Sequence, residues 1–178
     1  WLESAPAVVQ SWFAGQEFGN ALADILFGVV NPSGKLPVTF PRRLQDTPAY
    51  TSYPGEFGKV HYGEGIFVGY RWYASRDIEP LLPFGHGLSY TSFRYQDLAV
   101  SKLVDGVEVS FKLQNTGDRQ GKEIAQVYVE AVDSPVAKPR IELKGFAKLD
   151  LAPGETQSVS VVLGQDAFAH WDVSLSDW

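Results

Sequence analysis

The stretch YGEGIFVGYRWYASRDIEPLLPFGHGLSYTSF, Tyr62–Phe93, separates two parts of the chain that differ in character. Its many glycine and aromatic residues follow neither a helical nor a strand period, yet it is too apolar to be a disordered linker. We therefore expect an ordered belt that lies across a folded surface, with aromatic side chains buried and glycines at the corners. What the chain does should depend on what this belt joins.

The residues after the belt alternate in short runs between apolar and polar side chains. The clearest run is 107–114, VEVSFKLQ, which predicts a half-buried strand. Similar runs lie at 95–100, 123–131, 141–151 and 157–163, with turn residues between them. This spacing predicts a mainly β fold, an antiparallel β-sandwich of the immunoglobulin or fibronectin type III kind. Because such a sandwich has about seven strands, we expect the last strand to be missing from this sequence.

The residues before the belt predict a short α/β unit. Apolar runs at 6–13 and 35–40 are bounded by proline or glycine and predict short strands. Between them, the apolar residues of 18–26 recur at helical spacing, and Gly28 is placed to end the helix. A strand–helix–strand unit this short cannot bury both of its faces, so we expect it to close the edge of a larger α/β layer. Residues 41–61 have no period and predict a surface loop.

Composition excludes several classes of function. The net charge of −6, without a basic cluster, argues against a nucleic-acid partner. With no cysteine, disulfides, thiolate catalysis and cysteine zinc sites are excluded, and the three histidines (His61, His86 and His170) lack metal-ligand spacing. No apolar run approaches the ~20 residues that cross a bilayer. We therefore predict no cofactor, no metal, and no nucleic-acid or membrane partner, and leave a secreted, periplasmic or cytoplasmic location open.

Four motifs give the sequence a family resemblance. They are WFAGQEFGNALADILFGVVNPSGKLPVTFP (Trp12–Pro41), YGEGIFVGYRWY (Tyr62–Tyr73), PLLPFGHGLSYTSF (Pro80–Phe93) and ELKGFAKLDLAPGE (Glu142–Glu155). In this order they closely resemble the C-terminal part of family-3 glycoside hydrolases, chiefly β-glucosidases with β-xylosidases alongside. In that family a TIM-like barrel is followed by an α/β sandwich and then by a fibronectin type III-like domain. The resemblance implies that 1–45 end the α/β sandwich, 46–91 form an ordered connector and 92–178 form the third domain.

The resemblance also implies the chemistry of the whole enzyme. Family members hydrolyse with retention, using two carboxylates about 5–5.5 Å apart. The nucleophilic Asp comes from the barrel and the acid/base Glu from an earlier part of the sandwich, so no catalytic residue is assigned here. The fragment alone should be inactive, and its partner should be the N-terminal catalytic part. The implied substrates are oligosaccharides or glucosides with a terminal β-D-glucosyl residue, with a β-xyloside as the alternative.

Four belt residues are candidates for contact with substrate: Tyr62, Glu64, Arg71 and Trp72. Tyrosine and tryptophan combine an apolar face with a polar edge, which suits stacking on a sugar ring. The competing interpretation is that the aromatic residues pack between domains and that Glu64 makes a salt bridge or a turn contact.

Three other residues favour structural interpretations. Asp177 lies in a Ser-Asp-Trp triplet like the one around the family's nucleophile, but it follows AFAHWDVSL, which resembles a late hairpin of the fibronectin-like domain. Glu17 is expected in the first helical turn, where a carboxylate suits the helix dipole. His86, between two glycines, is expected at a tight corner with hydrogen bonds to the backbone.

These observations support a clamp function, in which the belt holds the fibronectin-like domain to the body of the enzyme. A second hypothesis is a free-standing β-sandwich module that binds carbohydrate or protein. A third is a regulatory or dimerising tail that makes the enzyme a homo-oligomer, which the sequence neither supports nor excludes.

Overall fold

The computed structural model describes residues 2–178. Its β-strands are β1 (Phe93–Leu103), β2 (Gly106–Asn115), β3 (Gly121–Val129), β4 (Glu142–Leu151) and β5 (Thr156–Gly164). Its helices are α1 (Phe18–Leu26) and α2 (Tyr70–Ser75), with short 3-10 turns η1 (Leu2–Ser4), η2 (Leu44–Asp46) and η3 (Gln165–Ala167).

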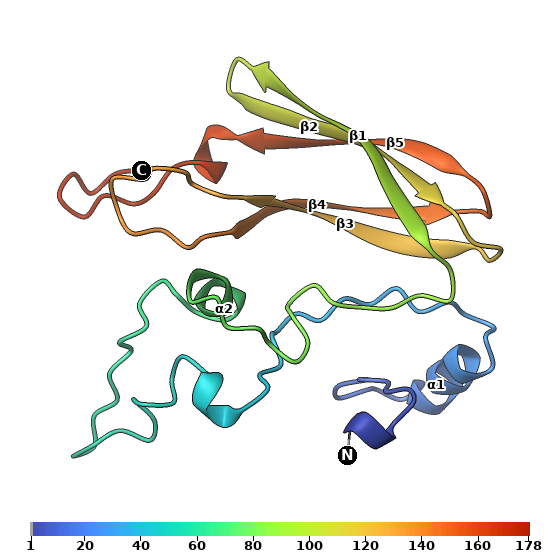
Figure 1. Cartoon of the computed structure of the whole chain (residues 1–178), viewed down its shortest axis with the longest axis horizontal. Helices are drawn as coiled ribbons and strands as arrows, with labels where there is room; N and C mark the ends of the chain where they lie inside the picture. Colours follow the sequence, from blue (N-terminus) through green and yellow to red (C-terminus); the bar gives the residue numbers. More distant parts are fainter. Residues whose placement is uncertain (1) are drawn as a thin grey trace.

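The five strands form the two layers of a β-sandwich (Figure 1). One sheet has the order β1-β2-β5 and the other pairs β3 with β4, all antiparallel. The core between the sheets contains Val109, Phe111 and Leu113 from β2, with Ala125 of β3 and Leu151 of β4. The mainly β class and the sandwich are therefore confirmed, with all five strands close to their predicted positions.

The alternation of apolar and polar residues along β2 places its apolar side chains on the core side of the sheet. Val109, Phe111 and Leu113 are buried, whereas Lys112 between them is exposed. In β3 Ala125 is the one buried hydrophobic side chain, with Val127 and Val129 packed beside it. A period of two side chains places every second residue in the core.

The predicted strands before the belt are wrong, because only the helix between them forms a regular element. Residues 6–13 are exposed and contain no strand. Residues 35–40 run beside the belt with two isolated pairs of backbone hydrogen bonds. Leu36 donates to His86 O and accepts from Gly85 N, and Phe40 forms an antiparallel bridge with Leu82. Between these positions the Phe84 N–H donates to the Thr39 hydroxyl and not to a backbone carbonyl, so the ladder is not continuous. Helix α1 ends as predicted, where Gly28 takes a positive φ of 73°.

The belt contains one element that its sequence did not reveal, the short helix α2. This helix lies against the β3–β4 side of the sandwich, on the same side as α1 and the irregular segments (Figure 1). Six residues are too few to show a clear helical period. The belt runs beside residues 35–40 and contacts β3 through the Tyr70–Tyr128 ring pair.

Candidate functional site

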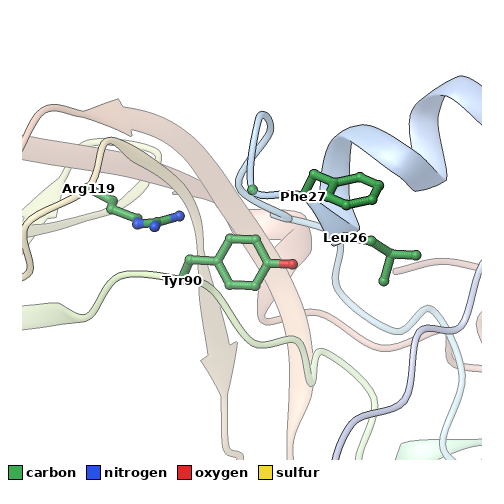
Figure 2. Close-up of a pocket in the computed structure, with 5 residues that line it drawn as sticks. Leu26, Phe27, Tyr90 and Arg119 are labelled. Atoms are coloured by element: carbon green, nitrogen blue, oxygen red, sulfur yellow. The ribbon is translucent and has the colours of Figure 1, made fainter.

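The candidate functional site is the contact of residues 25–40 and the belt with the β-sandwich. At one end of it, α1 meets the turn between β2 and β3. Tyr90 donates a hydrogen bond from its hydroxyl to Ile25 O (2.7 Å), one of the last carbonyls of α1. Arg119 points toward the same helix end, across a pocket of about 390 Å³ that Phe27 also lines (Figure 2). A cation here suits the negative end of the helix dipole.

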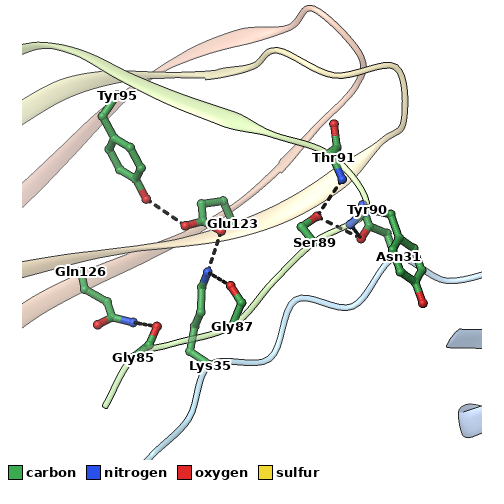
Figure 3. A network of polar contacts seen from close by, with 10 residues as sticks. All are labelled: Asn31, Lys35, Gly85, Gly87, Ser89, Tyr90, Thr91, Tyr95, Glu123 and Gln126. Carbon is green, nitrogen blue, oxygen red and sulfur yellow. Dashed lines mark hydrogen bonds and ion pairs between the residues drawn. The ribbon is translucent and has the colours of Figure 1, made fainter. Parts of the chain in front are cut away.

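Asn31 links the segment after α1 to the sandwich. Its side-chain oxygen accepts hydrogen bonds from Ser89 Oγ (3.0 Å) and Tyr90 N (2.8 Å) (Figure 3). Its amide nitrogen donates to Gln120 O (3.0 Å). One side chain therefore ties three segments that are distant in sequence. The resulting contact is specific, because each bond has a defined donor and acceptor.

Lys35 and Glu123 form the ionic centre of the contact. Lys35 Nζ lies 2.9 Å from Glu123 Oε2 and donates to Gly87 O at 3.1 Å (Figure 3). The other oxygen of Glu123 accepts a hydrogen bond from the Tyr95 hydroxyl at 3.0 Å. Burial, and then the neighbouring Glu123 carboxylate, raise the pKa of Tyr95, so this hydroxyl stays protonated and donates. Both charged side chains are mostly buried, which makes the pair costly to break on one side.

An aromatic cluster joins the belt to the β3–β4 sheet. Tyr70 of α2 stacks on Phe84, with ring centroids 4.7 Å apart, and meets Tyr128 edge to face at 5.9 Å. Its hydroxyl accepts a hydrogen bond from Leu143 N (2.8 Å) at the start of β4. Stacked and edge-to-face geometries are the favourable ones for aromatic pairs. The cluster therefore provides apolar contact and a directional bond at the same place.

A tight corner of the belt passes over this sheet at Gly85-His86-Gly87. Gly85 has a φ of +81°, and a Cβ atom there would collide with the side-chain amide of Gln126. At Gly87 a Cβ would collide with the Gly34 carbonyl oxygen. The backbone of His86 bonds to Pro83 O and accepts from Leu36 N. The glycines of this motif allow backbone approach, as the corner interpretation of His86 expects.

The four predicted substrate residues fall into two pairs. Arg71 and Trp72 lie on α2 and make internal contacts: Arg71 pairs with Glu142 at 3.2 Å, and Trp72 donates its indole N–H to Asp46 O at 3.1 Å. Tyr62 and Glu64 lie in one turn before α2, where the side chain of Tyr62 is exposed and one oxygen of Glu64 is buried without a hydrogen-bond partner in residues 2–178. Their role in binding substrate stays a prediction.

Asp46, which anchors Trp72, is itself held by Arg43. Arg43 Nη2 lies 2.6 Å from Asp46 Oδ1, and the Arg43 backbone N–H also donates to the carboxylate. The hydrogen bond from the Arg43 side chain lowers the pKa of Asp46. The pKa of Tyr73, which follows Trp72 in α2, is raised mainly by burial and also by the charge of Asp46. The loop before the belt is thus joined to α2.

Two other carboxylates have local roles. Glu17 lies at the N-terminal boundary of α1 and accepts a hydrogen bond from Asn20 at 2.7 Å. Asp177 forms an antiparallel bridge with Asp172, which gives the predicted hairpin. Within residues 2–178, no three His, Asp or Glu side chains gather as a metal site. None of the helices described there is long and apolar enough to span a membrane.

Sequence reasoning missed the polar residues that carry the contact, namely Asn31, Lys35 and Glu123. Each appears in the sequence as an ordinary turn or strand residue, since its partner is more than 50 positions away. Glu123 does begin the predicted third run, but nothing local indicates that it faces a lysine. They meet their partners only because residues 31–40, the belt and β3 pack together in the fold.

Two family models match parts of the chain. Residues 1–70 match the glycosyl hydrolase family 3 C-terminal domain, and residues 123–178 match the fibronectin type III-like domain.

Curated and solved relatives match the whole chain or nearly all of it. The thermostable β-glucosidase B of Acetivibrio thermocellus is 50% identical over 100% of this chain and 24% of its own length. The crystal structure of the Kluyveromyces marxianus β-glucosidase, labelled with selenomethionine, superposes with a TM-score of 0.94 at 45% identity, over 99% of this chain and 21% of that one. For the family-3 β-glucosidase of Bifidobacterium adolescentis the TM-score is 0.91 at 44% identity, over 95% and 25%. The chain thus spans about a quarter or less of the length of these relatives.

Proposed function

Since the chain belongs to the family-3 glycoside hydrolases and corresponds to their C-terminal part, we propose that it is the structural portion of a retaining β-glucosidase. The whole enzyme would remove terminal β-D-glucosyl residues from oligosaccharides or glucosides. The observation that supports this proposal best is that all or nearly all of this chain matches the corresponding part of proteins named β-glucosidase. The two reacting carboxylates would come from the N-terminal catalytic part, which is the partner of this chain.

Within that enzyme the function of this chain is to fix the position of the fibronectin-like sandwich. The supporting contacts are the Lys35–Glu123 pair and the Tyr70–Phe84 stack, which join the belt to β3 and β4. The proposal divides the chain into the end of the α/β sandwich (1–45), a connector (46–91) and the fibronectin-like domain (92–178). Of the four candidate substrate residues, Arg71 and Trp72 have internal partners that account for them, so Tyr62 and Glu64 are the better candidates for contact with sugar.

Two experiments test the substrate class of the enzyme and the clamp function of this chain. The full-length enzyme should hydrolyse p-nitrophenyl β-D-glucoside, and the same reaction with the β-xyloside decides between the two substrate classes. Phe84→Ala in that enzyme should lower the unfolding temperature of the C-terminal part, because it removes half of a stacked pair. An unchanged unfolding temperature would contradict the clamp.

The free-standing module is the second candidate function. Titration of the isolated chain with cello-oligosaccharides separates it from the clamp. Sub-millimolar binding by these 178 residues would favour the module, whereas the clamp predicts no such binding and no hydrolysis.

A further inference from the structure

Glu123 is a charged residue on the core face of the sandwich. In β3 it lies two positions after Gly121 and two before Ala125, which are both buried. Its partner in the regular pairing with β4 is Leu149, which packs against the core cluster. Because side chains alternate between the two faces of a strand, Glu123 shares the face of these residues. A carboxylate at such a position loses contact with water, which is costly unless donors replace the water.

Two donors satisfy the carboxylate of Glu123, and they come from different parts of the chain (Figure 3). The Tyr95 hydroxyl, from β1 of the opposite sheet, donates to Oε1 at 3.0 Å. Lys35 Nζ lies 2.9 Å from Oε2 and belongs to the segment before the belt, outside the sandwich. Among the described residues, 2–178, Lys35 forms the one salt bridge to Glu123. The sandwich thus supplies a neutral donor, whereas the opposite charge comes from outside it.

The segment 31–40 offers a cation at one position alone, because Lys35 is its only charged residue. Its few bonds to the belt use backbone groups, and every residue except proline carries both of these groups, so they select no particular register. If the segment slipped by two residues, Ser33 or Pro37 would take the place of Lys35. Glu123 would then be buried without a charge partner, a strongly unfavourable state.

We propose that Glu123 is a charge-specific lock, which fixes the register in which residues 31–40 dock on the sandwich. The surface formed by Glu123 and Tyr95 accepts a segment with a cationic side chain at one position and rejects a neutral or acidic one. A buried ion pair can do this even where it adds little stability, because its cost appears when the partner is wrong. The lock rests on the proposed clamp function and adds to it the residue that sets the specificity of docking.

The test is amide hydrogen exchange of the full-length enzyme at Leu36 and Phe40, whose N–H groups bond to the belt. Lys35→Met keeps the length of the side chain but removes its charge. We expect exchange at both amides to become about ten- to a hundredfold faster, because the carboxylate is left buried and unpaired. Adding Glu123→Gln to Lys35→Met should restore most of the protection, since the glutamine is neutral and still accepts from Tyr95.

Two controls separate the lock from a general loss of stability. Lys112→Met breaks an ion pair of the same 2.9 Å length, with Asp97, but both of its side chains are more than half exposed. An exposed pair contributes little, so exchange at Leu36 and Phe40 should stay unchanged in this variant. The amides of β2 in the sandwich core should keep their wild-type protection in every variant.

Three outcomes would overturn the lock. The first is wild-type exchange in Lys35→Met. The second is equally fast exchange in Lys35→Met with and without Glu123→Gln, which would show that packing of the lysine chain, and not charge, was lost. The third is an equal acceleration in β2. If instead Phe84→Ala leaves the unfolding temperature unchanged, the clamp itself fails, so the two failures are distinguishable.

Discussion

The sandwich and the segment before it differ in how they bury their side chains. In residues 93–167, nine hydrophobic side chains are buried in one cluster between two sheets. In residues 2–92 the only buried hydrophobic side chain is Tyr73, and every residue of α1 is at least partly exposed. The sandwich therefore contains its own core, whereas the earlier segment contacts it through hydrogen bonds, ion pairs and ring contacts. A nine-residue helix without buried residues has little stability of its own.

The largest expected effect tests whether the sandwich is the stable body. Leu113 of β2 is 0% exposed in the core, so Leu113→Ala should lower the free energy of unfolding by about 2–5 kcal/mol. Val162→Ala on the outer face of β5 is the control and should change it by less than about 0.5 kcal/mol. Chemical denaturation of the chain measures both. Equal losses would mean that the core does not carry the stability.

The second prediction concerns a buried polar residue that ties the belt to the sandwich. Asn115 is 0% exposed, donates to Arg119 O and Leu151 O, and accepts from Thr91 Oγ1 and Gly117 N. Asn115→Ala leaves these groups without partners and should cost about 1–3 kcal/mol of unfolding free energy. Denaturation measures the loss, with the exposed Asn20→Ala as control. A neutral result would show that water replaces the amide.

The third prediction separates hydrogen bonding from stacking at the aromatic cluster. Tyr70→Phe keeps the ring on Phe84 but removes the acceptor of the Leu143 N–H. We expect a loss of about 0.5–1.5 kcal/mol, smaller than the loss for Asn115→Ala. The measurement is the unfolding temperature together with amide hydrogen exchange at Leu143, whose protection should fall. Unchanged exchange would contradict the role of the hydroxyl.

The smallest effect is a pH dependence in the segment before the belt. Arg43 lowers the pKa of Asp46, so the pair contributes stability above the ordinary carboxyl pKa, and this contribution is lost as pH falls through the lowered value. The unfolding temperature of wild type should exceed that of Asp46→Asn at pH 6, and the difference should shrink toward pH 3. A difference that is constant with pH would show that the charge is unimportant.

Sequence reasoning succeeded where local pattern and tertiary environment agree. The alternation in 107–113 predicted which side chains of β2 enter the core, because a strand that is buried on one face must alternate. It failed for 6–13 and 35–40, where apolar runs suggested strands but a strand also needs a neighbour with free backbone groups. The helix α2 was missed because a single turn and a half shows no period.

For the candidate site too, the sequence indicated some features and not others. The glycines around His86 and the aromatic residues of the belt indicated that the belt packs on a folded surface. Glycines allow the backbone to approach closely there, and apolar rings favour burial. The partners did not follow from the sequence. Lys35 with Glu123 and Asn31 with Ser89 are side chains of ordinary type that meet only when the chain folds back on itself.

By itself, the sequence determined the sandwich, the ends of α1 and the resemblance to a family, because each rests on patterns within about ten to thirty neighbouring residues. The tertiary structure alone decided which charges and rings face one another across the belt. The physical reason is that local spacing fixes the face on which a side chain lies, whereas its partner is fixed by long-range packing.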